Sequence, residues 1–328
     1  MEKELVRRFG IPFEGIPAAG IHGVGLTDLP GNIIKLLQGV SRSRQIVKDF
    51  RPDCVLFTGG YVAVPMAIAA RCYPSVLFVP DIEPGMALKF LSRNAKMIAL
   101  CAENSKSYFS KHSNLKVTGY PIRNDLRGWT KEKAYKTMHL KSGDPVLLIL
   151  GGSKGARSIN RAVMSRLMEL LVKWQIIHVT GKLDWKEMEA NSKKLVPKLR
   201  SQYHVYPYLH EEMGAAMASA DLVVSRAGAS TLGEYPYFGL PAILVPYPYA
   251  WRYQKVNADY LVDNKAALMI RDEDLAAGLL PTISYLDKDP KKMASMRKAM
   301  RKLATPQAAH EIADLILDLA GKSRGGRS

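Results

Sequence analysis

Short apolar runs alternate along this chain with longer stretches in which apolar residues recur at helical spacing. The run 146–150 is unbroken and of strand length, which is typical of a parallel strand buried on both faces. The alternation predicts right-handed βαβ units and parallel sheets covered by helices. We expect strands at 54–58, 75–79, 97–101, 146–150, 175–180, 203–206, 221–225 and 242–246, and helices at 62–71, 84–94, 156–173, 184–200, 211–218, 231–238 and 253–263.

The length of 328 residues accommodates two ordinary domains, each with its own core. A polar stretch over 124–144, which holds Gly128 and Gly143, marks the expected boundary. We therefore predict an α/β protein with two Rossmann-like, doubly wound parallel-sheet domains. The predicted divisions are 1–127 for the first domain, 128–305 for the second, 306–320 for a final helix and 321–328 for a disordered, basic tail.

The composition is that of a globular protein, with 47% hydrophobic and 23% charged residues. The chain contains no run of about 20 apolar residues, so no membrane-spanning helix is predicted. The first ten residues lack the apolar core of a signal peptide. Cys54, Cys72 and Cys101 lie in apolar surroundings without metal-ligand spacing. We therefore expect three reduced core cysteines and no metal site.

The net charge of +17 raises the question of an anionic partner. The excess is spread over the chain, with +7 on residues 1–127 and +10 on the remainder. No helix-turn-helix, zinc-finger or stacking-aromatic pattern accompanies it, so nucleic acid is not an expected partner. A diphosphate substrate, an anionic membrane surface or a generally solvated basic surface accounts for the charge equally well.

The run 225–234 is the most informative motif, because it joins an expected strand to an expected helix through a small, Gly-containing turn. Such a turn leaves backbone N–H groups and the positive end of the helix dipole available to a phosphate. Glu234, one turn inside the helix, is suited to accept two hydroxyl protons from a ribose. Phosphate and ribose together indicate a nucleotide; the alternative for Glu234 is a solvated helix carboxylate.

A second turn of this kind, 151–156, follows the expected strand 146–150. Its glycines permit positive φ and close approach of the backbone to a ligand. Alone it is weak evidence, since many such turns only pack a helix on a sheet. Two turns followed by the aromatic segment 246–250, Gln254 and Asn257 form a more specific constellation.

The ordered motifs GGSKGARSIN, VTG, SRAGASTLGE, GLPAILVPYPYA and Q-x-x-NA resemble the MurG-type N-acetylglucosaminyltransferases of glycosyltransferase family 28. FTGGYVAVP and VTGYPIR are similar to the family's marks in its first half. The resemblance covers nearly the whole chain. It implies the GT-B fold, in which two Rossmann-like domains face a cleft.

The resemblance also implies where UDP-N-acetylglucosamine (UDP-GlcNAc) binds. Ser153 and the backbone near Gly152 and Gly155 would contact the diphosphate, with N–H groups from Ala229, Ser230 and Thr231. Glu234 would hold the ribose, backbone groups at Leu209 would meet the uracil, and Gln254 would contact the sugar. Two alternatives stay open: Arg226 makes either a ligand contact or a salt bridge that fixes the turn, and Asn257 either braces its loop or packs. The full set is Arg123, Gly152, Ser153, Gly155, Leu209, Arg226, Ala229, Ser230, Thr231, Glu234, Gln254 and Asn257.

The implied reaction is inverting, metal-independent and cofactor-independent transfer of GlcNAc from UDP-GlcNAc to a lipid-linked acceptor, converting lipid I to lipid II in peptidoglycan synthesis. Helix N-termini and preorganised N–H groups would stabilise the leaving UDP. No catalytic base is assigned, because the family's Gly-rich loop with its histidine is not found in this chain. Asp81 is a possible substitute; its alternative is a helix cap or turn residue.

The chain departs from the family pattern in its first domain. It begins at the helix before an expected strand at 11–16, so about 40 residues that precede this helix in the family are not found and the first domain is expected to be truncated. The family's His-Glu-Gln-Asn segment is replaced by Phe78-Val79-Pro80-Asp81. Three alternatives follow: another glycolipid acceptor, a non-catalytic UDP-sugar-binding module and, more remotely, a UDP-GlcNAc epimerase.

A lipid acceptor implies contact with a membrane. Apolar residues at 33, 34, 36, 37 and 40 lie beside Lys35, Arg42, Arg44, Lys48 and Arg51. A helix of this kind suits an anionic leaflet, and its alternative is an ordinary amphipathic helix packed on its sheet. The expected location is therefore cytoplasmic and peripheral, on the inner face of the cell membrane.

Overall fold

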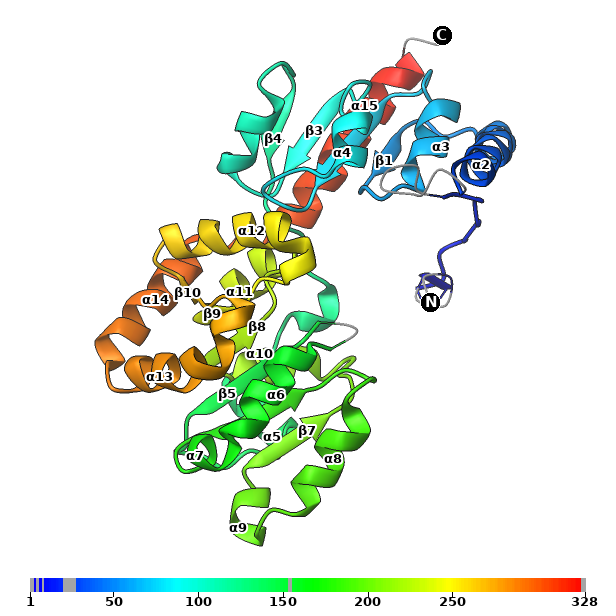
Figure 1. Ribbon diagram of the computed structural model, residues 1–328. Helices are drawn as coiled ribbons and strands as arrows, with labels where there is room; N and C mark the ends of the chain where they lie inside the picture. The colour runs from blue at the N-terminus through cyan, green and yellow to red at the C-terminus, as the bar shows by residue number, and fades with distance from the viewer. Residues whose placement is uncertain (1–2, 4–5, 8, 20–27, 153–154, 326–328) are drawn as a thin grey trace. The chain divides into compact units, whose positions relative to one another are not determined.

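The computed structural model describes residues 3, 6–7, 9–19, 28–152 and 155–325, which form two compact units (Figure 1). The first unit comprises Met1–Pro80, Pro84–Thr118 and His310–Ser328, and the second comprises Asp81–Glu83 and Gly119–Ala309. Tyr120 packs against Gly233, and Arg127 donates a 2.8 Å hydrogen bond to the carbonyl of Pro306. These contacts hold the segment after Gly119 on the second unit, so the units divide before the predicted 127/128 boundary.

The first unit contains a four-stranded parallel sheet in the order β1-β2-β3-β4. Its central strand β2 is buried along its whole length, as a parallel strand covered on both faces must be. The strands are β1 (Val55–Phe57), β2 (Ser75–Val79), β3 (Met97–Leu100) and β4 (Leu115–Val117); the helices are α2 (Leu29–Phe50), α3 (Ala63–Ala69), α4 (Met86–Leu91), η1 (Glu103–Phe109) and α15 (Ala308–Gly325).

The second unit contains a six-stranded parallel sheet in the order β10-β9-β8-β5-β6-β7. The chain moves outward from β5 in one direction through β6 and β7, and in the other through β8, β9 and β10, which is the doubly wound arrangement. The strands are β5 (Val146–Leu150), β6 (Gln175–Val179), β7 (Tyr203–Tyr206), β8 (Leu222–Ser225), β9 (Ala242–Leu244) and β10 (Ala267–Met269).

Helices connect these strands in the second unit (Figure 1). One apolar cluster joins β5, β6, β8 and β9 to α6, α7, α13 and α14. The helices are η2 (Asn124–Leu126), α5 (Lys131–Thr137), α6 (Arg157–Ser165), α7 (Leu167–Leu171), α8 (Trp185–Lys193), α9 (Pro197–Arg200), α10 (Met213–Ser219), α11 (Thr231–Phe238), η3 (Pro248–Ala250), α12 (Trp251–Asp263), η4 (Asp272–Asp274), α13 (Leu275–Asp287) and α14 (Pro290–Lys302).

The prediction of two parallel-sheet α/β domains is confirmed, and all eight expected strands in 54–246 are present. The expected strand at 11–16 is wrong: these residues form no strand, and Ile11 is exposed. Pro12 lies inside the segment and Pro17 directly follows it, and proline lacks the N–H that a strand ladder needs. β4 and β10 were not predicted, because three-residue strands carry too short a pattern.

Other local expectations also need correction. The expected helix 184–200 is divided into α8 and α9, with Pro197 opening the second helix. Residues 321–325 continue α15 instead of forming a disordered tail, because extending an existing helix is easier than starting one. Of the three expected core cysteines only Cys101 is buried, while Cys54 is half-buried and Cys72 is exposed in the turn after α3.

A chain of buried polar groups crosses the core of the second unit. His178, on β6, is fully buried, with Nδ1 2.8 Å from the Tyr203 hydroxyl and Nε2 3.0 Å from Asn160 Oδ1. The Asn160 amide donates to the Thr180 carbonyl at 2.9 Å and to Asp184 Oδ2 at 2.8 Å. Burial lowers the pKa of His178 from 6.5 to about 3, so the imidazole stays neutral.

The neutral His178 predicts an acid-sensitive second unit. The unfolded chain binds a proton near pH 6.5 and the folded chain does not, so this contribution to stability is lost as the pH falls from 6.5 toward 3. We expect a loss of about 2 kcal/mol at pH 5 relative to pH 7. H178Q should lack this part of the loss. Urea unfolding followed by tryptophan fluorescence isolates the effect, because all four tryptophans lie in the second unit; equal pH slopes in both proteins would contradict it.

Candidate functional site

A cavity of about 950 Å³ lies at the carboxyl edge of the second sheet. Its walls include Leu150 at the end of β5, Val179 at the end of β6 and Ser225 at the end of β8. β5 and β8 are neighbours whose following connections run in opposite directions, so their carboxyl ends leave a crevice. Ligands of doubly wound sheets bind at such a crevice.

The first wall is the turn between β5 and α6. Gly152 has φ +80° and Gly155 has φ +84°, which favour glycine at both positions. A Cβ on Gly155 would lie 2.3 Å from the Thr180 carbonyl oxygen, so only glycine lets the turn lie this close to the end of β6. Both glycines line the cavity. Ser153 and Lys154 lie outside the described residues.

The second wall is the N-terminus of α11. The Thr231 N–H and hydroxyl both donate to the Gly228 carbonyl, at 3.0 and 2.7 Å, so Thr231 closes the turn rather than offering its N–H. This corrects the expected role of that amide. Within the described part of the chain, the N–H groups of Ala229 and Ser230 have no bonded acceptor. Ser230 lines the cavity and Ala229 does not.

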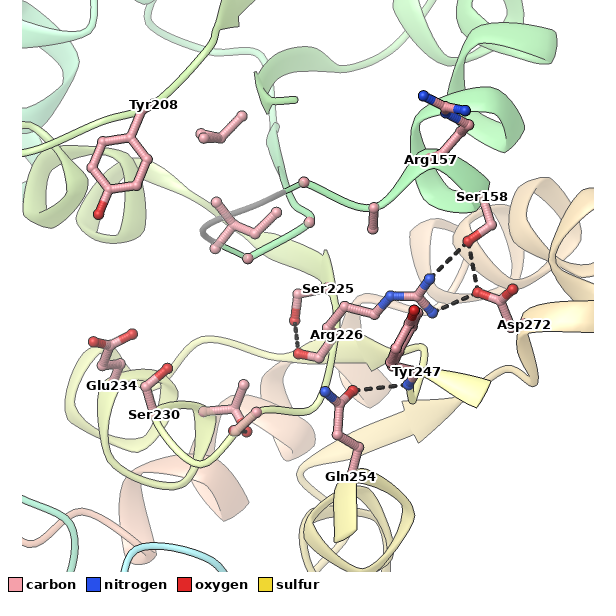
Figure 2. Close-up of a pocket in the computed structure, with 18 of the residues that line it drawn as sticks. Arg157, Ser158, Tyr208, Ser225, Arg226, Ser230, Glu234, Tyr247, Gln254 and Asp272 are labelled. Carbon is pink, nitrogen blue, oxygen red and sulfur yellow. Dashed lines mark hydrogen bonds and ion pairs between the residues drawn. The ribbon is translucent and has the colours of Figure 1, made fainter. Parts of the chain in front are cut away.

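Glu234 lies in the first turn of α11 and faces the cavity (Figure 2). Burial raises the pKa of Glu234 to about 7, against the opposing effects of the Arg123 charge and a hydrogen bond from Ser230. Arg123, which also lines the cavity, lies 3.3 Å from Asp125. The carboxylate is therefore held at a desolvated position, which disfavours the expected alternative of a fully solvated helix residue.

Arg226 occupies the middle of the site and is fully engaged with the protein. Its Nη1 pairs with Asp272 and donates to the Val245 carbonyl at 3.1 Å, and its Nη2 donates to Ser158 Oγ at 2.8 Å. The guanidinium lies over the ring of Tyr247, 5.3 Å from the centroid. The salt-bridge alternative for Arg226 therefore agrees with the geometry: it ties the two turns together (Figure 2).

Gln254 points into the same cavity with a defined orientation (Figure 2). Its Oε1 accepts a 2.8 Å hydrogen bond from the Tyr247 N–H. A backbone N–H only donates, so the oxygen must face Tyr247 and the side-chain NH₂ is left to donate to a ligand. The fold thus uses the accepting group of the expected sugar contact internally.

Asn257 and Leu209 do not line the cavity. Asn257 is fully buried: its Oδ1 accepts from the Ile82 N–H at 3.0 Å, and its NH₂ donates to Asp81 and to the Ala227 carbonyl. It thus braces the turn from behind. Leu209 is also buried, and its neighbour Tyr208 faces the cavity instead.

Asp81, the possible catalytic base, is not part of the cavity wall. Its Oδ1 accepts a 2.8 Å hydrogen bond from the Asn257 amide, and burial raises its pKa. The hydrogen bond to Asn257 supports a structural role for Asp81, as a turn residue, over a role as catalytic base.

Eight predicted residues line this cavity together: Arg123, Gly152, Gly155, Arg226, Ser230, Thr231, Glu234 and Gln254. Sequence reasoning missed Arg157, Ser158 and Asp272, which also line it. Arg157 and Ser158 stand directly after the second Gly-rich turn, a signal that could have identified them. Asp272 follows β10 and has no local motif, so only the fold brings it to the site.

No described helix has the length and apolar character of a membrane span. The described residues also contain no group of three or more His, Cys, Asp or Glu side chains arranged to hold a metal ion. The cavity wall combines backbone turns and arginines with the carboxylates of Glu234 and Asp272 and the oriented amide of Gln254.

Comparison with known proteins places this geometry in a family. The glycosyltransferase family 28 C-terminal domain matches residues 146–313, and the family's N-terminal domain matches residues 1–100. The UDP-N-acetylglucosamine--N-acetylmuramyl-(pentapeptide) pyrophosphoryl-undecaprenol N-acetylglucosamine transferase of Roseiflexus sp. is 37% identical over 96% of this chain and 81% of its own. The protein of the same name from Desulforudis audaxviator is 36% identical, over 98% of this chain and 88% of its own.

Solved structures agree with these relatives. The crystal structure of Acinetobacter baumannii MurG has a TM-score of 0.72 and 26% identity, covering 97% of this chain and 88% of that one. A UDP-GlcNAc 2-epimerase from Neisseria meningitidis bound to UDP-GlcNAc has a TM-score of 0.64 at 15% identity, covering 97% of this chain and 88% of its own, which shows a shared fold alone. With both family domains matched and relatives above 30% identity along its length, this chain belongs to glycosyltransferase family 28 and has the GT-B fold.

Proposed function

We propose that this chain transfers GlcNAc from UDP-GlcNAc to undecaprenyl-pyrophosphoryl-N-acetylmuramyl-pentapeptide, converting lipid I to lipid II in peptidoglycan synthesis. The relatives' names specify this donor and this acceptor. The observation that carries the proposal is a single cavity that combines two strand-to-helix turns with Glu234 and the amide of Gln254. These groups have the chemistry that a diphosphate, a ribose and an amino sugar require.

The donor is expected to lie along the crevice between the two turns. The N–H group of Ser230, with the turn at Gly152 and Gly155, would bind the diphosphate. Glu234 would accept from the two ribose hydroxyls. Uracil would lie at the part of the wall that Tyr208 lines, next to the expected contact at Leu209, and the Gln254 NH₂ would donate to the sugar.

The reaction is a single displacement with inversion. The acceptor hydroxyl attacks the anomeric carbon on the face opposite UDP, and the bond from that carbon to the β-phosphate oxygen breaks. Charge develops on the leaving diphosphate, where preorganised N–H groups at two helix N-termini stabilise it without a metal ion. The hydroxyl proton passes to a base that we leave unassigned.

The acceptor of the named relatives carries an undecaprenyl chain, so we infer peripheral binding to the inner face of the cell membrane. On α2, Val40 and Val47 are buried while Ile34 and Leu37 are 55% and 64% exposed. Exposed Lys35, Arg44 and Lys48 lie on the same helix. One face of α2 therefore packs on its own unit and another offers apolar and basic side chains to an anionic leaflet.

The proposed reaction predicts a strict acceptor preference. Incubation of the full chain with UDP-[¹⁴C]GlcNAc should label lipid I and leave a diacylglycerol lipid unlabelled, with the product resolved by thin-layer chromatography. Labelling of the diacylglycerol lipid alone would contradict lipid I as the acceptor and identify another glycolipid pathway. Normal binding of UDP-GlcNAc without transfer to any lipid would favour a non-catalytic sugar-nucleotide module.

Glu234 is predicted to be required for UDP binding but costly for folding. E234A removes two charge-assisted hydrogen bonds of roughly 1.5–3 kcal/mol each, so calorimetry should show at least a tenfold loss of UDP affinity. The pKa of Glu234 in the folded chain, about 7, lies above the ordinary value of 4.5. The contribution of this carboxyl to the free energy of unfolding is therefore lost as the pH rises through 7. E234Q should therefore gain thermal stability relative to the natural chain between pH 5.5 and pH 8. Unchanged UDP affinity in E234A would remove Glu234 from the site.

The α2 surface predicts binding to anionic membranes. The double variant I34S/L37S should sediment less with phosphatidylglycerol vesicles than the natural chain, while neither protein sediments with phosphatidylcholine vesicles. L317S is a matched control, because Leu317 is 67% exposed on α15 of the same unit. Equal sedimentation of I34S/L37S and the natural chain would contradict the assignment of this surface.

A further inference from the structure

Arg157 is the first residue of α6 and lines the cavity (Figure 2). A cation at this end of a helix faces the positive end of the helix dipole, which is unfavourable. The first turn of α6 carries no acidic residue that would offset it. The position is therefore explained better by an anion bound in the cavity than by the stability of the helix.

Of the other two arginines of the cavity wall, Arg226 is fully engaged with the protein, whereas Arg123 makes one exposed ion pair. Arg226 is paired with Asp272, and both terminal nitrogens of its guanidinium make hydrogen bonds within the protein. Arg123 lies 3.3 Å from Asp125. Arg157 differs from Arg226, because only its Nε donates to a protein group, at 3.1 Å to Asp184. Among the described residues, none accepts a hydrogen bond from its two terminal nitrogens.

Asp184 holds Arg157 from inside the protein. The Asp184 side chain is 7% exposed and that of Arg157 is 62% exposed, so the ion pair joins a buried anchor to an accessible cation. The second carboxylate oxygen of Asp184 accepts from Asn160, which in turn is bonded to His178. Both of these residues are fully buried. A buried polar chain is costly unless every group is satisfied, and this one ends on a single cavity-lining cation.

We propose that Arg157 contacts the diphosphate of the bound nucleotide, and that Asp184 and Asn160 are positioning residues that fix its guanidinium. This inference rests on the proposed function, because it names a further group for the same donor site. A guanidinium held through Nε presents its two terminal nitrogens as a fork, which matches two phosphate oxygens. Arg157 would thus supply the cation that neutralises the leaving diphosphate, beside the N–H groups of the turns.

Calorimetry with uridine and UDP tests this assignment, since only UDP carries the diphosphate. R157Q should lower UDP affinity at least tenfold and change uridine affinity less than twofold. D184N keeps Arg157 but loosens its anchor, so UDP affinity should fall several-fold, again without loss of uridine binding. R161Q is the matched control: it removes an exposed arginine of the same helix that does not line the cavity, and UDP affinity should stay within twofold.

Several outcomes overturn the inference. The first is an R157Q variant that retains UDP affinity, and the second is one that loses uridine and UDP affinity alike. The third is an equal loss of UDP affinity in R161Q, which would point to long-range charge. In each case the proposed function stands if the natural chain binds UDP more tightly than uridine. A natural chain that binds no UDP overturns both. Tryptophan fluorescence during urea unfolding confirms that each variant is folded before titration.

Discussion

The adjacency of β5 and β8 is the constraint on which the cavity of the second unit depends. These parallel strands are neighbours in the second sheet, yet the connections that follow them leave toward opposite sides. The two helix N-termini that follow, at Arg157 and Thr231, therefore open on one crevice. Arg226 then ties the walls together through Ser158, the carbonyl of Val245 and Asp272.

The second unit places groups at and beside the cavity that are unfavourable for folding. Glu234 is a desolvated carboxylate with a raised pKa, and Arg157 is a cation at the positive end of a helix. The N–H groups of Ala229 and Ser230 have no acceptor among the described residues. Each of these groups gains a partner if a nucleotide diphosphate binds, so the site exchanges folding stability for complementarity to its ligand.

The buried hydrogen-bonded chain from Tyr203 through His178 and Asn160 to Asp184 links the core of the second unit to a side chain of the cavity wall. These polar groups lie between apolar layers, where hydrophobic side chains of similar volume would fold as well or better. Their hydrogen bonds fix the start of α6 against the end of β6. The orientation of a cavity-lining side chain is thereby determined by residues that do not line the cavity.

The sequence by itself determined the parallel α/β class, the eight main strands and the two phosphate-type turns, because buried strands and Gly-rich turns are encoded locally. It also indicated Glu234 through its position one turn after the second of these turns along the chain, and Gln254 through the resemblance to the family's motif. Only the tertiary structure decided that Thr231 closes its own turn, that Asn257 braces from behind, and that Arg226 is neutralised by Asp272. The roles of Asn257 and Arg226 depend on partners from other segments, such as Asp272 after β10, whose distance along the chain leaves no local pattern.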